Sequence, residues 1–188
     1  MKTGLIDASS AILLYKANLF TAVSAAYRLK VAPAVLKEIT VVKRKGASFF
    51  RRAFDTGSLF PAEPGPEPDA SNLPALGEGE RETLMAFRND QGDFVIIDDG
   101  RGAAACRTDA IPYINALLCP KLLHWAGALD RGACDAAFNT ILAVGRYSKQ
   151  VVDYVETCTP DMLSGFAPFD LQHEMTRCHL PNLEAFIK

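Results

Sequence analysis

The chain has 188 residues, of which 49% are hydrophobic and 22% are charged, and its formal net charge at pH 7 is -2. These values predict one soluble domain, or one domain with an appendage, with a sizeable core, and exclude a global attraction to nucleic acid or membranes. Five cysteines without a C-x-x-C pair indicate neither a zinc motif nor a disulfide framework. An acid at position 7 comes too early for a signal peptide, and no apolar run approaches the ~20 residues that span a bilayer, so we expect a cytoplasmic protein.

The N-terminal segment predicts a strand followed by helical structure. Residues 3–6 can form a short strand that ends at Asp7. Ser9 or Ser10 can cap the next helix, because a hydroxyl there accepts a hydrogen bond from the first free amides of a helix. Apolar residues over positions 12–27 recur with a spacing that suits one or two helices.

The next part of the chain alternates an extended segment with a helix and a loop. Residues 31–33 are extended, and Pro33 is well placed at the start of a helix that carries Glu38. Residues 43–52 are the most basic stretch of the chain. Five prolines between positions 61 and 74 then predict an irregular loop.

A glycine- and glutamate-rich stretch, residues 77–82, opens another predicted helix. Residues 94–97 are apolar and three of the four are β-branched, which predicts a short buried strand. This strand ends at two adjacent carboxylates, Asp98 and Asp99. Gly100 then permits a turn into an alanine-rich helix.

The C-terminal part is predicted to be mostly helical. Residues 111–114 form a candidate last strand, and apolar helices follow over about 117–129 and 134–155, the second of them broken near Gly145. The tail from residue 159 predicts only short helical pieces. Strands that alternate with helices predict an α/β fold with a parallel sheet and a helix-rich C-terminal part.

Acidic residues recur where these predicted strands end and where the helices lie. In a parallel sheet with crossover connections, such positions can converge on one edge. Carboxylates that face one pocket repel one another unless they are protonated or neutralised, and a hard divalent cation with oxygen ligands, Mg²⁺ or Mn²⁺, is the usual solution. The acids concerned are Asp7, Glu38, Glu80, Glu82, Asp98 and Asp99.

Four stretches of the chain, in order, resemble the PIN-domain family of metal-dependent ribonucleases, which includes the VapC-type toxins. The closest likeness is to a subgroup with a Gly-Glu helix start and a doubled Asp. The resemblance implies a three-layer fold over residues 1–130, with a central parallel sheet flanked by helices. A helical C-terminal extension over residues 131–188 would pack on the same domain. The four stretches are LIDAS (5–9), VAPAVLKEI (31–39), LGEGERETLMA (76–86) and FVIIDD (94–99).

The resemblance implies that the protein hydrolyses RNA phosphodiester bonds with Mg²⁺ or Mn²⁺ held by carboxylates. Asp7 and Glu38 match the first and second acids of the family. Ser9 matches the small hydroxyl residue that often comes after the first acid, and we predict that it contacts RNA. A VapC-type toxin would also have a small antitoxin protein as its partner.

For the third and the fourth acid, the same resemblance leaves two candidates each. Counting from Ala86 favours Glu82 as the third acid, which we predict, whereas the Gly-Glu step favours Glu80. Alignment of the strand end favours Asp99 as the fourth acid, with Asp98 beside it as the alternative ligand.

The basic stretch offers a path for an RNA backbone, with Phe49 and Phe50 placed among its charges to stack a base. The alternative is a solvated helix face with two core phenylalanines. Arg101 either contacts phosphate or pairs with a local acid. The predicted RNA-binding residues, besides Ser9, are Lys43, Arg44, Lys45, Arg51, Arg52 and Arg101.

Two alternatives compete with a nuclease. Asp7 and Asp99 each come after a strand and precede a helix, so either one can serve simply as a helix N-cap. The whole domain can also be a catalytically idle PIN fold that binds RNA or a protein. The tail after about residue 155 is long enough to cover the pocket, to form a homodimer contact or to hold a partner.

Overall fold

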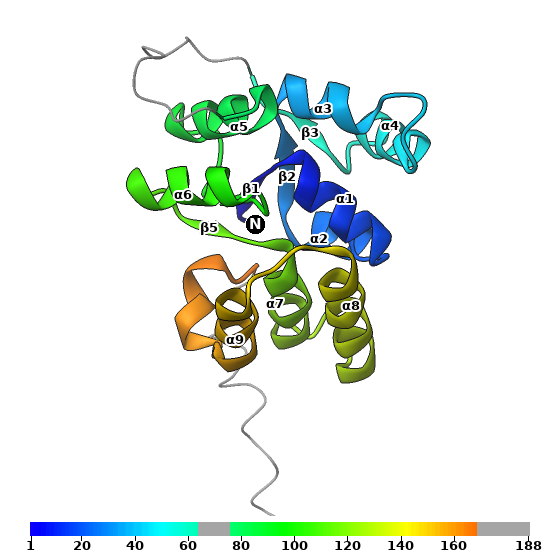
Figure 1. Ribbon diagram of the computed structural model, residues 1–188. Helices are drawn as coiled ribbons and strands as arrows, with labels where there is room; N and C mark the ends of the chain where they lie inside the picture. The colour runs from blue at the N-terminus through cyan, green and yellow to red at the C-terminus, as the bar shows by residue number, and fades with distance from the viewer. Residues whose placement is uncertain (64–75, 169–188) are drawn as a thin grey trace, which may run out of the picture.

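A five-stranded parallel sheet forms the centre of the computed structural model, which describes residues 1–63 and 76–168 (Figure 1). The chain first adds two strands on one side of β1 and then two on the other, so the direction of growth reverses between β1 and β4. Ligands of open α/β sheets bind at the carboxyl ends of the strands beside such a reversal. In spatial order the strands are β3 (Phe60–Pro61), β2 (Arg28–Val31), β1 (Thr3–Ile6), β4 (Phe94–Ile96) and β5 (Tyr113–Ile114).

Side chains of the central strands alternate between two apolar layers, as the pleat of a strand requires. Ile6 and Ile96 belong to the larger layer, and Leu5 and Val95 belong to the smaller one. The smaller layer lies under α5 (Glu78–Arg88) and α6 (Gly100–Thr108). The helices of the larger layer are α1 (Ala8–Lys16), α2 (Phe20–Ala26), α3 (Pro33–Ile39), α4 (Ala47–Asp55), α7 (Cys119–Trp125), α8 (Arg131–Val144) and α9 (Lys149–Thr157).

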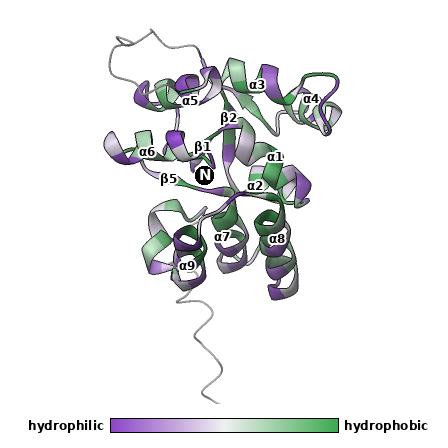
Figure 2. Cartoon of the chain, in the orientation of Figure 1, coloured by the Kyte–Doolittle hydropathy of each residue, from purple (hydrophilic) through white to green (hydrophobic). Residues whose placement is uncertain are grey.

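The helices alternate hydrophobic and hydrophilic residues, as Figure 2 shows along α5, α8 and α9. Each therefore has an apolar side to bury against the sheet or a neighbouring helix. Within residues 1–63 and 76–168, no helix is both long and apolar enough to cross a membrane.

The predicted α/β fold is confirmed, with two differences in detail. The helix expected over 117–129 is a 3₁₀ turn, η2 (Ala116–Leu118), followed by α7, which ends before Gly127, a glycine with a φ of 72°. The predicted break near Gly145 separates α8 from α9. Strand β3 was not predicted, because two residues carry no periodic signal. The predicted proline-rich loop from residue 64 on, and the tail from residue 169 on, lie outside the described residues.

The C-terminal helices pack on the same core as the sheet. Helix α8 contacts α7 and α1, and the chain then returns through α9 to a 3₁₀ helix, η3 (Asp161–Phe166). The Tyr27 hydroxyl donates a hydrogen bond to the backbone oxygen of Phe166 at 2.8 Å. The Phe166 ring packs edge-on against Phe94, with ring centroids 5.6 Å apart. Because Tyr27 precedes β2 and Phe94 begins β4, η3 is attached at the amino ends of the strands.

Phe50 occupies an aromatic cluster between α1, α2 and α4. Its side chain is fully buried, and its ring lies 5.6 Å from Tyr15, 5.3 Å from Phe20 and 5.4 Å from Phe49, measured between centroids. Phe49 packs partly buried against the same cluster. The two phenylalanines are therefore core residues, and Phe50 has no exposed face on which a base can stack.

We expect Phe50→Ala to lower the free energy of unfolding by about 3–5 kcal/mol, because the substitution leaves a cavity in a closely packed cluster. Ser48→Ala on the exposed side of the same helix should change it by less than about 0.5 kcal/mol. Urea denaturation followed by circular dichroism measures both. Equal stabilities for the two variants would show that Phe50 is not a core residue.

Candidate active site

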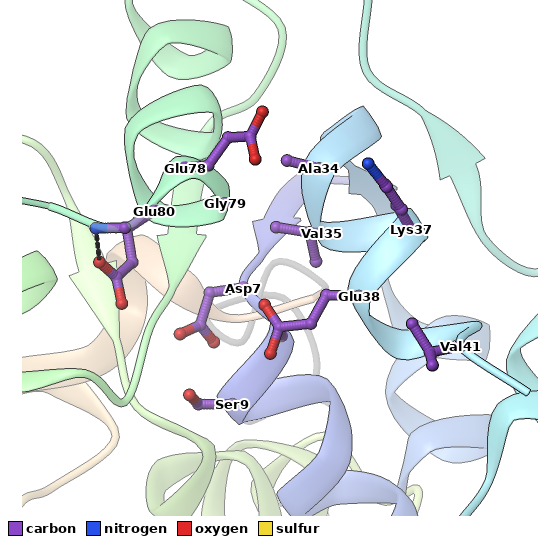
Figure 3. Close-up of a pocket in the computed structure, with 12 residues that line it drawn as sticks. Asp7, Ser9, Ala34, Val35, Lys37, Glu38, Val41, Glu78, Gly79 and Glu80 are labelled. Atoms are coloured by element: carbon purple, nitrogen blue, oxygen red, sulfur yellow. Dashed lines mark hydrogen bonds between the residues drawn. The ribbon is translucent and has the colours of Figure 1, made fainter. Parts of the chain in front are cut away.

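A pocket of about 370 Å³ opens beside the carboxyl end of β1, between the beginnings of α1 and α5 and one side of α3 (Figure 3). Asp7 and Glu38 turn their carboxylates towards the same space, and Glu80 lies at its side (Figure 3). The residues that line the pocket are Asp7, Ala8, Ser9, Ala34, Val35, Lys37, Glu38, Val41, Gly77, Glu78, Gly79 and Glu80.

Asp7 is the most deeply buried acid of this pocket. It comes directly after β1, it is 2% exposed, and its Oδ1 accepts a hydrogen bond from the Ser10 amide at 2.7 Å. Burial raises the pKa of Asp7 to about 7, and the nearby charges of Asp98 and Glu80 act in the same direction. No lysine or arginine of the described residues forms an ion pair with it. Asp7 therefore has the predicted N-cap role. It is also a buried carboxyl that no lysine or arginine of the described residues balances.

Asp98 is held next to Asp7 through Ser10. The Ser10 hydroxyl donates to Asp98 Oδ2 at 2.7 Å, while the Ser10 amide donates to Asp7. The Ala116 amide also donates to Oδ2, at 2.9 Å, and the Tyr147 hydroxyl donates to Oδ1. Burial raises the pKa of Asp98, and these three hydrogen bonds oppose that shift. Of the three donors, only Ser10 had a signal in the sequence, as a candidate helix cap.

Asp99, the neighbouring acid, points elsewhere. Its Oδ1 accepts hydrogen bonds from the amides of Arg101 at 2.8 Å and Gly102 at 3.1 Å, so it caps α6. The guanidinium of Arg101 lies 3.9 Å from the same oxygen. The structure thus places Asp98 beside Asp7 and uses Asp99 at the start of a helix.

Glu80 and Glu82 also lie on different sides of α5. Glu80 lines the pocket, and its Oε2 accepts a hydrogen bond from the Gly77 amide at 2.7 Å, the dashed line in Figure 3. Glu82 is not among the described residues that line the pocket. Its Oε2 accepts a hydrogen bond from the Ala34 amide at 2.8 Å, in the first turn of α3. Glu82 therefore satisfies a free amide at the start of the helix that carries Glu38.

Glu38 and Glu80 line the same pocket, and the helices that carry them, α3 and α5, pack tightly against each other. A Cβ built on Gly79 would lie 2.9 Å from Cγ2 of Val35, closer than side chains normally approach. Glycine at position 79 therefore lets the start of α5 approach α3. Glu38 itself is half exposed and forms an ion pair with Arg44 at 3.0 Å.

The predicted RNA-binding residues occupy three places. Ser9 is exposed and lines the pocket. The basic residues at 43–45 are exposed in the connection between α3 and α4, which also contains the pocket residue Val41. The Arg51 guanidinium donates to the backbone oxygen of Thr40 at 2.6 Å, and Arg52 is exposed on α4. Arg101 lies apart from them, at the start of α6.

The structure is thus an all-parallel α/β fold with an acidic pocket beside the reversal of its sheet. A family model described as a PIN domain matches residues 4–126, more than half of the chain. The chain therefore belongs to the PIN-domain family, and proteins of this family are generally nucleases that use divalent metals. Comparisons with curated proteins and with solved structures found no match.

The side chains fit a divalent cation by their chemistry, because the pocket offers carboxylate oxygens, which Mg²⁺ and Mn²⁺ prefer. Within residues 1–63 and 76–168, no three His, Cys, Asp or Glu side chains are grouped closely enough to hold an ion as they stand. Binding by three carboxylates therefore requires a side-chain rotation in the pocket.

We expect the free energy of unfolding to fall as the pH rises from about 4 to 7 in metal-free buffer. The pKa of Asp7 is about 7 in the folded chain and near its ordinary 3.8 in the unfolded chain, so within this window only the folded chain keeps the proton. Asp7→Asn retains an N-cap oxygen and has no charge to bury. It should flatten this profile and raise the free energy of unfolding at pH 8 by roughly 2–4 kcal/mol.

Urea denaturation between pH 4 and pH 8 measures the effect. Asp130→Asn is a matched control, because Asp130 caps α8 through the Ala133 amide at 2.8 Å but is exposed. Parallel pH profiles for wild type and Asp7→Asn would contradict the burial of a carboxyl with a raised pKa.

Proposed function

We propose that the acidic pocket binds Mg²⁺ or Mn²⁺ and that the protein is a metal-dependent endoribonuclease. One observation carries the proposal: Asp7 is buried at the reversal of the sheet, close to Asp98 and Glu80, and has no basic partner among the described residues. Holding these carboxyls together without a cation costs free energy. A divalent ion that enters the pocket relieves their repulsion, and this relief adds to its binding free energy. Membership of the PIN-domain family supports the same activity.

Asp7, Glu38, Glu80 and Asp98 are the ligands that the pocket favours. The first three line it, and Asp98 is joined to Asp7 through Ser10. Glu82 and Asp99, which the sequence favoured as third and fourth acids, have their carboxylates engaged at the starts of α3 and α6. When bound, the ion supplies Lewis-acid chemistry, polarising the phosphate and activating water for attack.

Glu38 is the acid that is freest to move. Its ion pair with Arg44 is exposed on both sides, and exposed pairs contribute no more than about 1 kcal/mol. Replacement of the ion pair with Arg44 by a bond from Glu38 to the metal therefore costs little free energy. The same exchange releases the Arg44 guanidinium at the edge of the pocket, where it suits a phosphate group.

The connection between α3 and α4 gives the RNA backbone a basic path into the pocket. Residues 43–45 are all cationic and exposed, and they lie next to the pocket residue Val41. Contacts of this kind fix the register of a strand without reading its sequence. If the ribonuclease is the toxin of a toxin–antitoxin pair, a small antitoxin protein is expected to cover this pocket.

Glu80→Gln should reduce Mn²⁺-dependent RNA cleavage by at least about 100-fold, whereas Glu82→Gln should keep it within about threefold. The reason is that Glu80 lines the pocket, whereas Glu82 is not among the described residues that line it. We expect Glu82→Gln to lower the free energy of unfolding by about 0.5–1 kcal/mol, because its amide oxygen is a weaker acceptor for the Ala34 amide.

Cleavage assays on a structured RNA and Mn²⁺ titration calorimetry test this pair of variants. The reverse ranking, with Glu82→Gln inactive and Glu80→Gln active, would return the third ligand to Glu82. RNA binding without any Mn²⁺-dependent cleavage by the wild-type protein would favour the idle PIN fold instead.

The double variant Lys43→Ala/Lys45→Ala should bind single-stranded RNA more weakly and with a smaller salt dependence. Each lost phosphate contact removes about 0.7 from the slope of log K against log salt, so the slope should fall by about 1.4. Lys16→Ala/Lys149→Ala removes the same charge from other exposed helix positions and should leave the slope unchanged. Equal slopes for all three proteins would exclude the connection at 43–45 from the RNA path.

A further inference from the structure

We propose that Tyr147, which lies beyond the matched family segment, is a positioning residue that fixes the Asp98 carboxylate beside Asp7 at the edge of the acidic pocket. The inference rests on the proposed function, since it assigns Asp98 to a cation site. It makes the C-terminal helices part of the site.

The contacts of Asp98 divide between its two oxygens. Ser10 and Ala116 both donate to Oδ2, at 2.7 and 2.9 Å, and the Tyr147 hydroxyl donates to Oδ1. A carboxylate offers about four acceptor positions, so three are occupied and the remaining one is on Oδ1. Because Tyr147 holds the same oxygen, its hydroxyl determines where that last position points.

The short connection between α8 and α9 determines where the ring of Tyr147 lies. Gly145 ends α8 in an extended conformation, and a Cβ built on it would lie 2.3 Å from Cε2 of Tyr147 and 2.9 Å from the backbone oxygen of Ile141. A side chain at position 145 must therefore displace the ring or the helix end. On the other side of Tyr147, Ser148 begins α9 and accepts a hydrogen bond from the Val151 amide at 3.4 Å.

The chain contains a second tyrosine that makes a similar contact away from the pocket. Tyr27 donates its hydroxyl to the backbone oxygen of Phe166, at the amino ends of the strands. Both tyrosines thus join the family domain to the C-terminal helices through one hydroxyl. Of these two, only Tyr147 reaches an acid that Ser10 joins to the pocket residue Asp7, so a comparison of the two separates positioning of Asp98 from attachment of the helices.

Tyr147→Phe and Tyr27→Phe in the full chain test the inference. Calorimetry gives the Mn²⁺ dissociation constant, thermal unfolding in EDTA gives stability without metal, and RNA cleavage gives kcat and KM. We expect Tyr147→Phe to weaken Mn²⁺ binding by about 10-fold or more and to lower kcat with KM nearly unchanged. Tyr27→Phe should lower the melting temperature and leave Mn²⁺ affinity and kcat within about twofold.

Gly145→Ala provides an independent variant, because its added Cβ collides with the Tyr147 ring and the end of α8 while the Tyr147 hydroxyl is kept. It should weaken Mn²⁺ binding in the same direction as Tyr147→Phe. Unchanged Mn²⁺ affinity in Tyr147→Phe and in Gly145→Ala would overturn the inference, and so would equal losses of affinity in Tyr147→Phe and Tyr27→Phe. A wild-type protein that binds no Mn²⁺ would overturn the proposed function itself, and this inference with it.

Discussion

The burial of the Asp7 carboxyl at the end of β1 is the constraint on which the rest of the site depends. Burial removes the carboxyl from water, and two further acids raise its pKa together with that burial. Ser10 compensates in part, since its amide holds Asp7 and its hydroxyl holds Asp98. Ser10 therefore connects the start of α1, the end of β4 and the pocket. Keeping these acids together lowers the stability of the fold.

Pairs of neighbouring acids serve different purposes in this fold. Asp98 turns to Ser10 and Tyr147, whereas Asp99 turns back to cap α6. Glu80 borders the pocket and Glu82 holds the first turn of α3. Residues two apart on a helix point in different directions, so α5 can contribute to the pocket with one acid and to the neighbouring helix with the other.

The centre of the parallel sheet was predictable because β1 and β4 are short apolar runs followed by acids and the β2 segment runs up to Pro33, which are local signals. The choice between Glu80 and Glu82 was not, since it depends on how α5 is rotated against α3, and that rotation depends on the contact at Gly79. Tyr147 carried no signal, because nothing in its own segment indicates a partner 49 residues earlier in the chain. An aspartate that comes directly after a strand can cap a helix or bind a metal, and the sequence does not distinguish these two roles, as Asp7 illustrates.

The wide separation of the Asp98 donors along the chain bears on when the site is complete. Its contacts come from Ser10, Ala116 and Tyr147, so residues of the last quarter of the chain are needed to finish a pocket that begins at Asp7. During synthesis, a ribosome-bound chain that has emerged only as far as the family segment lacks the Tyr147 contact.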